Sequence, residues 1–271
     1  MSSVSLLISS YNQPNALALV FEGVLTQTQA IDELVIGDDG SQPDTRELVE
    51  QFRERAPFTV HYEWQEDRGF RKSRALNLAI RRSAGDFVLF LDGDCIPPPS
   101  WAERYVRELS GRTDFATAGY VLMDLERTQA MQQEVIAEGR IDEGVTDAEV
   151  EAFAKIHKKE RLYALLRKKK KPKILGGNWA CKRTSLYDVN GYDERFDGFG
   201  KEDSDIRNRL QNASHRGRSM WDRNWVYHCS HDFDPRRNLP GVVRSEPDYD
   251  YYTSRLRAKR CELGLDRPDA G

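Results

Sequence analysis

The chain has 271 residues, of which 39% are hydrophobic and 31% are charged, so it can form one large or two small globular domains with a polar surface. Its formal net charge of -3 excludes a globally basic nucleic-acid binder, and no nucleic acid is expected as a partner. Its four cysteines form no CxxC pair, which argues against a structural zinc site and favours a reducing compartment.

Short apolar runs alternate with helical patterns through the first 120 residues. Strands are predicted at 4–8, 33–37, 58–62, 87–91 and 115–121. Between them, apolar residues recur at helical spacing near 17–24, 48–52 and 75–80. This alternation predicts an α/β fold with a single, mostly parallel, Rossmann-like sheet flanked by helices. Such sheets bind ligands beyond the carboxyl ends of their strands, where the aspartates at 38–39 and 92–94 fall.

Residues 124–173 are polar and are predicted to be helical, ending in "RKKKKPK" at 167–173. Ten basic residues and one acidic residue lie between Lys155 and Lys173. The run is either a solvated helix end stopped by Pro172 or a patch that contacts an anionic acceptor or membrane surface. No apolar run approaches the length of a membrane span, and the amino terminus lacks a signal-peptide pattern. A cytoplasmic protein is therefore expected, with a peripheral contact at the inner face of the membrane as the functional alternative.

Two aspartates follow the predicted strand at 87–91, in the stretch "FLDGDCIPPP". Only Gly93 separates Asp92 from Asp94, and three prolines stop the chain soon afterwards. Burying a charge is costly unless it is paired or binds a metal, so these aspartates either cap a turn or hold a cation. Their spacing suits a hard divalent cation such as Mg²⁺ or Mn²⁺, which prefers oxygen ligands and substrate phosphates.

Two further segments of the first half suit a nucleotide. Asp39, in "DDGS", can accept a hydrogen bond from a pyrimidine N3–H, and Tyr11 offers a ring for stacking, although DDGS is also a common turn. Arg71, Lys72 and Arg74 crowd a predicted helix N-terminus, which favours a diphosphate, although a basic solvent-facing helix gives the same pattern. The dinucleotide and P-loop fingerprints are absent, which weakens hydride transfer and ATP hydrolysis as functions.

The second half contributes acidic residues and histidines. Glu202, Asp203 and Asp205 lie at a predicted helix start, where capping alone explains acidic residues. His228 and His231 follow an apolar stretch, and either is a candidate metal ligand or a buried structural histidine. The tail after Tyr252 is predicted to be a charged surface helix with a frayed end from Asp266.

Taken in order, the motifs DDGS, GFRxxxxxN, DGD, GGN, GxGxED and HxxH resemble those of family 2 glycosyltransferases with the GT-A fold. The carboxyl half resembles β-1,4-galactosyltransferases and bacterial polysaccharide-synthesising transferases, and the resemblance covers roughly residues 4–235. It implies a GT-A domain with a nucleotide-sugar-binding half (1–120), an acceptor-binding and catalytic half with a smaller helical region (121–252), and a charged tail (253–271). Gly200 and Lys201 stand where galactosyltransferases have two glycines, which leaves the acceptor open.

The resemblance also implies site residues. The catalytic base is Asp203, and the expected metal ligands are Asp94, Asp92, His231 and His228, holding Mn²⁺ or Mg²⁺. The donor-binding residues are Ser9, Tyr11, Asp39, Arg71, Arg74, Asn77, Asp92, Gly93 and Asp94. The acceptor-side residues are Glu202 and Asp205, with Trp179 as a wall of the sugar site.

The expected function is metal-dependent, inverting transfer of a hexose or N-acetylhexosamine from a UDP-sugar. The acceptor is a hydroxyl of a saccharide or of a lipid-linked saccharide or glycolipid, in bacterial polysaccharide or lipopolysaccharide synthesis. Two alternatives stay open, a sugar-nucleotide pyrophosphorylase and a non-catalytic carbohydrate- or membrane-binding module. Pyrophosphate release distinguishes the first, and metal-independent binding without turnover distinguishes the second.

Overall fold

The computed structural model describes residues 2–131, 133–141, 145–166, 171–198, 200–230 and 251–266. Its centre is a seven-stranded sheet in the order β3-β2-β1-β4-β8-β6-β9. The strands β1 (Val4–Ser10), β2 (Glu33–Asp38), β3 (Thr59–Trp64) and β4 (Phe87–Asp92) are parallel, as predicted. The strand β8 (Asn178–Lys182) is antiparallel to β4 and to β6 (Phe115–Thr117), and β9 (Gly217–Ser219) runs parallel to β6 at the edge. Both predicted halves of the chain therefore contribute strands to one sheet.

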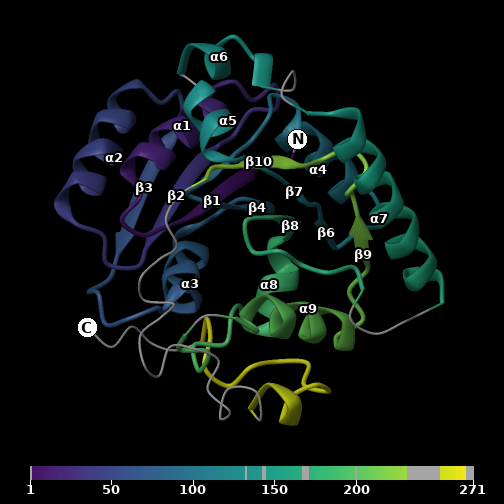
Figure 1. Ribbon diagram of the computed structural model, residues 1–271. Helices are drawn as coiled ribbons and strands as arrows, with labels where there is room; N and C mark the ends of the chain where they lie inside the picture. The colour runs from purple at the N-terminus through teal and green to yellow at the C-terminus, as the bar shows by residue number, and fades with distance from the viewer. Residues whose placement is uncertain are drawn as a thin grey trace.

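Helices cover both faces of this sheet, which is why its central strands β1, β2 and β4 are buried along almost their whole length. Leu6 and Ile8 pack into one core with α1 (Pro14–Leu25), α2 (Pro43–Arg55) and α4 (Trp101–Leu109). Leu7, between them on β1, packs into a second core with α3 (Lys72–Arg82), α8 (Arg183–Val189) and α9 (Glu202–Asn212). Prolines at the first turns of α1 and α2 suit helix starts, because a helix leaves that N–H without a partner. Figure 1 shows α3, α8 and α9 together below the sheet.

The predicted strand at 115–121 is wrong in its extent, because it divides into two strands of different sheets. Its first part is β6, and its last residues begin β7 (Tyr120–Leu122), which joins β10 (Val226–His228) and β5 (Cys95–Ile96) in a three-stranded sheet. The break falls at Gly119, where a Cβ atom would lie 2.2 Å from the Trp221 ring. Packing against this tryptophan thus turns the chain out of the main sheet.

The polar region predicted to be helical contains α5 (Leu125–Ala130), α6 (Gln133–Ala137) and α7 (Asp147–Leu165). Thr146 and Glu149 form a reciprocal capping box that starts α7. Phe153 of α7 stacks on Trp225, with ring centroids 5.4 Å apart, so the helix is attached through an aromatic contact. Among the described helices, none combines the length and apolar character that crossing a bilayer requires.

The prediction of a surface helix after Tyr252 is wrong. Residues 251–266 form one short helical turn and then irregular structure. Cys261 and Leu265 are buried against α8 and the loop after it, and Asn212 of α9 donates hydrogen bonds to the carbonyls of Leu256 and Ala258. Burial of Cys261 and Leu265 and the hydrogen bonds from Asn212 therefore fix the path of the tail, although its sequence is charged.

Candidate active site

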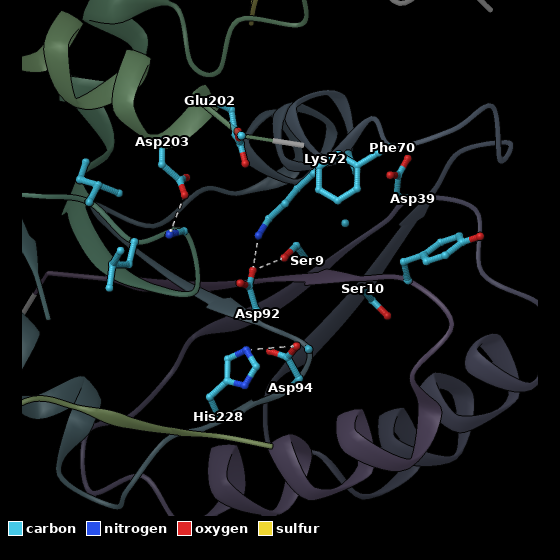
Figure 2. A pocket seen from close by; sticks show the side chains of 18 of the residues that line it. Ser9, Ser10, Asp39, Phe70, Lys72, Asp92, Asp94, Glu202, Asp203 and His228 are labelled. Carbon is cyan, nitrogen blue, oxygen red and sulfur yellow. Dashed lines mark hydrogen bonds and ion pairs between the residues drawn. The ribbon is translucent and has the colours of Figure 1, made fainter. Parts of the chain in front are cut away.

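A cavity of about 370 Å³ opens at the carboxyl ends of β1, β2 and β4, between the first residues of α3 and α9. Figure 2 shows that side chains from both halves of the chain point into it. The predicted site residues that line it are Ser9, Tyr11, Asp39, Asp92, Gly93, Asp94, Glu202, Asp203 and His228. The sheet therefore gathers most of the predicted donor, metal and base residues in one place.

The two aspartates of the DDGS segment have different surroundings. Asp38 is fully buried, and its Oδ1 accepts hydrogen bonds from the N–H groups of Gly40 and Ser41, which closes the turn. Asp39 lines the cavity, and its carboxylate accepts from Gln65 Nε2 at 2.6 Å and from the Arg71 N–H at 2.8 Å. One carboxylate thus builds the turn and the next is held at the cavity wall.

Asp92, the first aspartate of DGD, is neutralised by a lysine. Its Oδ1 accepts a 2.6 Å hydrogen bond from the Ser9 hydroxyl and forms an ion pair with Lys72 of α3 (Figure 2). Burial by itself lowers the pKa of Lys72, but the Asp92 charge and hydrogen bond outweigh it and raise that pKa above its ordinary value. Lys72 therefore stays charged and fixes Asp92 at the bottom of the cavity.

Asp94, the second aspartate, lies beside His228. The pairing of β10 with β5 places His228 opposite Cys95, and His228 Nε2 lies 3.7 Å from Asp94 Oδ2. The carbonyl oxygen of Cys229 lies 2.9 Å from His228 Nδ1 and can only accept, so Nδ1 is the donor. In the neutral imidazole, Nε2 then presents its lone pair on the side of Asp94.

The donor atoms around Asp94 suit a hard cation. Single ligand atoms of Asp94, Cys95 and His228 all lie within 4.8 Å of one another. Cys95 is completely buried, and burial and the neighbouring Asp94 raise the pKa of its thiol well above the usual range. A neutral thiol is a poor ligand, so the usable donors are a carboxylate oxygen and an imidazole nitrogen, which fit Mg²⁺ or Mn²⁺. His231, the other predicted ligand, lies outside the described residues.

The GGN motif separates the two acidic sides of the cavity. The Gly176 N–H donates to Asp203 Oδ2 at 2.9 Å, and a Cβ on Gly176 would lie 2.9 Å from both oxygens of that carboxylate. A Cβ on Gly177 would lie 2.6 Å from Asp92 Oδ2. The absence of side chains here lets the backbone pass between the two carboxylates, so both can line one cavity.

Glu202 and Asp203 lie at the first turn of α9. Burial raises the pKa of both carboxyls above their ordinary values, and the charge of Asp203 raises that of Glu202 further. The nearby ammonium of Lys72 opposes the rise at Asp203. Asp203 Oδ1 is buried and makes no hydrogen bond within the described part of the chain. A carboxylate with a raised pKa and an unused oxygen is suited to accept a proton.

Two predicted site residues are instead parts of the core. The prediction that Trp179 forms a wall of the sugar site is wrong, because its side chain is completely buried and stacks on Phe90 with ring centroids 4.3 Å apart. Asn77 is also completely buried, where it donates to the Tyr192 carbonyl and accepts from the Tyr192 N–H, both at 2.9 Å. Both residues position the surrounding elements rather than reach the cavity.

Three charged residues also lie elsewhere than predicted. Asp205 does not face the acceptor side, because it forms a buried 2.7 Å ion pair with Arg209, one helical turn further along α9. Arg71 and Arg74 line a separate hollow of about 110 Å³ together with Glu194 and Phe196. The predicted contact of these two guanidinium groups with the donor is therefore not supported by their position.

Several residues that line the cavity had no predicted site role, among them Phe70 and Tyr120, and Lys72 is predicted only as part of a basic helix start. A signal for Lys72 existed, because it precedes the buried Ala75, Leu76 and Ala79 at helical spacing and so shares their sheet-facing side. Tyr120 carries no comparable signal. Its hydroxyl accepts a 2.9 Å hydrogen bond from the Gly177 N–H, which only the folded chain brings near.

Comparison with known proteins agrees with this site. Residues 5–189 match the family model described as glycosyl transferase family 2, and residues 159–232 match one described as the N-terminal domain of galactosyltransferase. The chain is 32% identical over 117 residues to a hyaluronan synthase of Pasteurella multocida, and 24% identical over 228 residues to a chondroitin synthase of Escherichia coli. These alignments cover 43% and 78% of this chain but 12% and 32% of the two relatives, so the chain matches a part of each.

Two solved structures have a similar fold. S. aureus TarS 1–349 in complex with UDP-GlcNAc gives a TM-score of 0.63 at 15% identity, covering 94% of this chain and 65% of that one. The mannosyltransferase PcManGT from Pyrobaculum calidifontis, in complex with GDP-Man and Mn²⁺, gives 0.60 at 17% identity, covering 94% and 61%. The strand order of the sheet and these two similar structures define the GT-A fold. The chain belongs to glycosyl transferase family 2, which confirms the family, fold class and enzyme class predicted from the motifs.

Proposed function

We propose that this glycosyltransferase moves a hexose or N-acetylhexosamine from a UDP-sugar to a saccharide hydroxyl, with inversion and with a divalent cation. The observation that carries the proposal is the division of one cavity by Gly176 and Gly177. Asp92, Asp94 and His228 lie on one side, and Asp203 lies on the other. A donor diphosphate needs a bound cation, and an acceptor hydroxyl needs a base. Both must lie within reach of one anomeric carbon. The UDP-GlcNAc complex of TarS supports a UDP-sugar as donor.

The donor side is formed by the ends of β1, β2 and β4. Asp39 is oriented by Gln65 and by the Arg71 N–H, so it can accept from the N3–H of uracil, and Tyr11 offers its ring nearby. Ser9 and Lys72 hold Asp92 in place for a donor hydroxyl. Asp94 and His228 are the described residues that would hold the cation. When bound, the cation supplies positive charge that stabilises the diphosphate leaving group.

The acceptor side depends on Asp203. Its carboxylate takes the proton of the acceptor hydroxyl, while that oxygen forms a bond to the anomeric carbon and the bond to the diphosphate oxygen breaks. One such displacement inverts the anomeric centre and releases UDP. Glu202, whose pKa is raised further by Asp203, is suited to remain protonated and to donate to an acceptor oxygen. The Gly176 N–H holds Asp203 in position.

Polysaccharide synthesis is the supported setting, because the relatives named above are a hyaluronan synthase and a chondroitin synthase. A saccharide or lipid-linked saccharide acceptor, a cytoplasmic location and a peripheral contact of 167–173 with an anionic membrane belong to the same proposal. Residues 167–170 lie outside the described residues, so the structure gives no contact for most of that segment.

The test is a donor screen. The protein is incubated with a panel of UDP- and GDP-sugars and with mono- and oligosaccharide acceptors, and nucleotide release is measured with Mn²⁺, with Mg²⁺ and with EDTA. We expect metal-dependent UDP release that an acceptor stimulates, and a product of inverted anomeric configuration by NMR. Release of pyrophosphate instead would identify a pyrophosphorylase. Metal-independent saccharide binding without nucleotide release would identify a binding module.

A further inference from the structure

We propose that a second cavity, between α7 and β9, binds the part of an anionic acceptor saccharide that lies beyond the reacting sugar. The role as an acceptor subsite rests on the proposed function. The cavity measures about 530 Å³ and is lined by Lys158, Glu160, Arg161, Leu162, Ala164, Pro172, Gly217, Arg218 and Ser219. We call it the α7–β9 groove. None of these residues lines the candidate active site.

One segment of backbone joins the groove to the candidate active site. Pro172 lines the groove, and the next residue, Lys173, lines the active-site cavity. Successive Cα atoms are about 3.8 Å apart, so the two cavities lie on either side of this segment. The Thr117 hydroxyl donates to the Lys173 carbonyl at 2.8 Å, and the Gly176 N–H donates to Asp203. The segment is thus fixed at both points and leads from the groove to the proposed base.

The charges of the groove favour an anionic ligand. Lys158 and Arg161 place exposed cations along it, and Arg218 adds a third that is shared with Glu108, whose Oε1 lies 3.6 Å from Arg218 Nε. Its carboxylate, Glu160, is bound by Lys171, so it does not cancel these cations. The described residues of the groove therefore present excess positive charge in a protein whose net charge is -3.

Glu160 favours a ligand that carries hydroxyl groups. Its side chain is only 4% exposed, and while Oε1 accepts from Lys171, its buried Oε2 has no hydrogen-bond partner among the described residues. A buried acceptor without a partner is costly, and a ligand hydroxyl would satisfy it. A ligand with both acid groups and hydroxyl groups matches an acidic saccharide. Leu162, 52% exposed, offers apolar surface for the face of a sugar ring.

A saccharide chain fits this shape better than a membrane does. The cations line a concavity formed by a helix, an edge strand and Pro172, whereas a bilayer surface contacts convex or flat patches. The joining segment also leads from the groove toward the proposed base. An extended acceptor requires such a path to the base, whereas a lipid headgroup does not. An acidic oligosaccharide is therefore the single occupant proposed.

The experiment uses the full chain with Arg161→Gln and Arg218→Gln combined, and a matched control with Arg107→Gln and Arg257→Gln, which are exposed arginines outside both cavities. The probes are uronic-acid oligosaccharides of increasing length, neutral oligosaccharides of the same lengths, and vesicles with anionic lipid. Binding is measured by calorimetry at low and high salt, and thermal unfolding confirms that each variant is folded.

We expect the groove variant to bind the long acidic oligosaccharides about tenfold more weakly at low salt, with a smaller difference at high salt. Neutral oligosaccharides and UDP should bind as they do to the unmodified protein, and the control variant should behave like that protein. Equal binding of the acidic probes by both variants would overturn the proposal, as would loss of vesicle binding alone. Absence of nucleotide release from every donor would overturn the proposed function, whereas the binding difference would still identify the groove as a saccharide site.

Discussion

The ammonium of Lys72 is bonded to the carboxylate of Asp92, and this pair lies beside Asp203 in the candidate active site. Lys72 begins α3, and Asp92 ends β4, so the contact joins a helix start to a strand end. The cation therefore acts on two carboxylates. It orients Asp92 by a direct bond, and its charge lowers the otherwise raised pKa of Asp203.

The first prediction concerns the pH dependence of transfer. Asp203 acts as a base only when it is ionised, so activity should fall as the pH decreases through its raised pKa. Lys72→Met removes the cation that lowers this pKa, so the acidic limb of the kcat/KM profile should move to higher pH. Lys72→Arg keeps the charge and should keep the limb near its original position. An unchanged profile in Lys72→Met would show that Lys72 only shapes the fold.

The second prediction separates the two carboxyls at the start of α9. Asp203→Asn keeps the size of the side chain and removes the base, so kcat should fall by about 10²–10⁴-fold while UDP binding is retained. Glu202→Gln keeps a hydrogen-bond donor and should cost less. Steady-state kinetics of both variants test the assignment. A larger loss in Glu202→Gln than in Asp203→Asn would transfer the role of base to Glu202.

The third prediction concerns the cation. Asp94→Ala and His228→Ala should each weaken Mn²⁺-dependent UDP binding and abolish most transfer, because each removes one of the facing donor atoms. Cys95→Ser should retain UDP binding, because a buried thiol with a raised pKa is not expected to bind the cation. Calorimetry with and without Mn²⁺ measures both effects. Full activity in EDTA would contradict the metal site.

The fourth prediction concerns the stability of α9. Asp205→Ala leaves Arg209 buried without its ion-pair partner, which should lower the free energy of unfolding by about 3–5 kcal/mol. Asp188→Ala, at a carboxylate whose side chain is 63% exposed, is the matched control and should change little. Urea denaturation measures the difference. Unchanged stability with a raised acceptor KM would instead restore the acceptor role first predicted for Asp205.

The fifth prediction concerns the lysine-rich segment. Replacing Lys168, Lys169 and Lys170 by Gln should weaken association with anionic vesicles, since each basic residue near an anionic leaflet contributes about 1 kcal/mol. The effect should be largest at low salt, because salt screens such contacts. Vesicle cosedimentation measures it, with UDP binding as the control. If neither the substitutions nor salt alters cosedimentation, the segment is a solvated helix end.

The sequence by itself determined the parallel half of the sheet and the place of the candidate donor-binding residues. The apolar runs of β1, β2 and β4 are continuous because helices cover both of their faces, and a polar residue following such a run must lie at the carboxyl edge of the sheet. The position of Asp39 and Asp92 at this edge was therefore predictable from local pattern, whereas Ser9 was predicted only through the resemblance to family 2 glycosyltransferases. The same reasoning gave the helix that contains Lys72, though not its role.

The tertiary structure alone decided which polar residues face the cavity and which are buried. Trp179, Asn77 and Asp205 look like site residues in the sequence, yet each is buried against a partner from another turn or element. The approach of Gly176 to Asp203 and the pairing of Asp94 with His228 join segments far apart in the chain. Spacing along the sequence fixes the side of a helix or strand that a residue occupies, whereas the partner it meets there depends on long-range packing, which no local pattern contains.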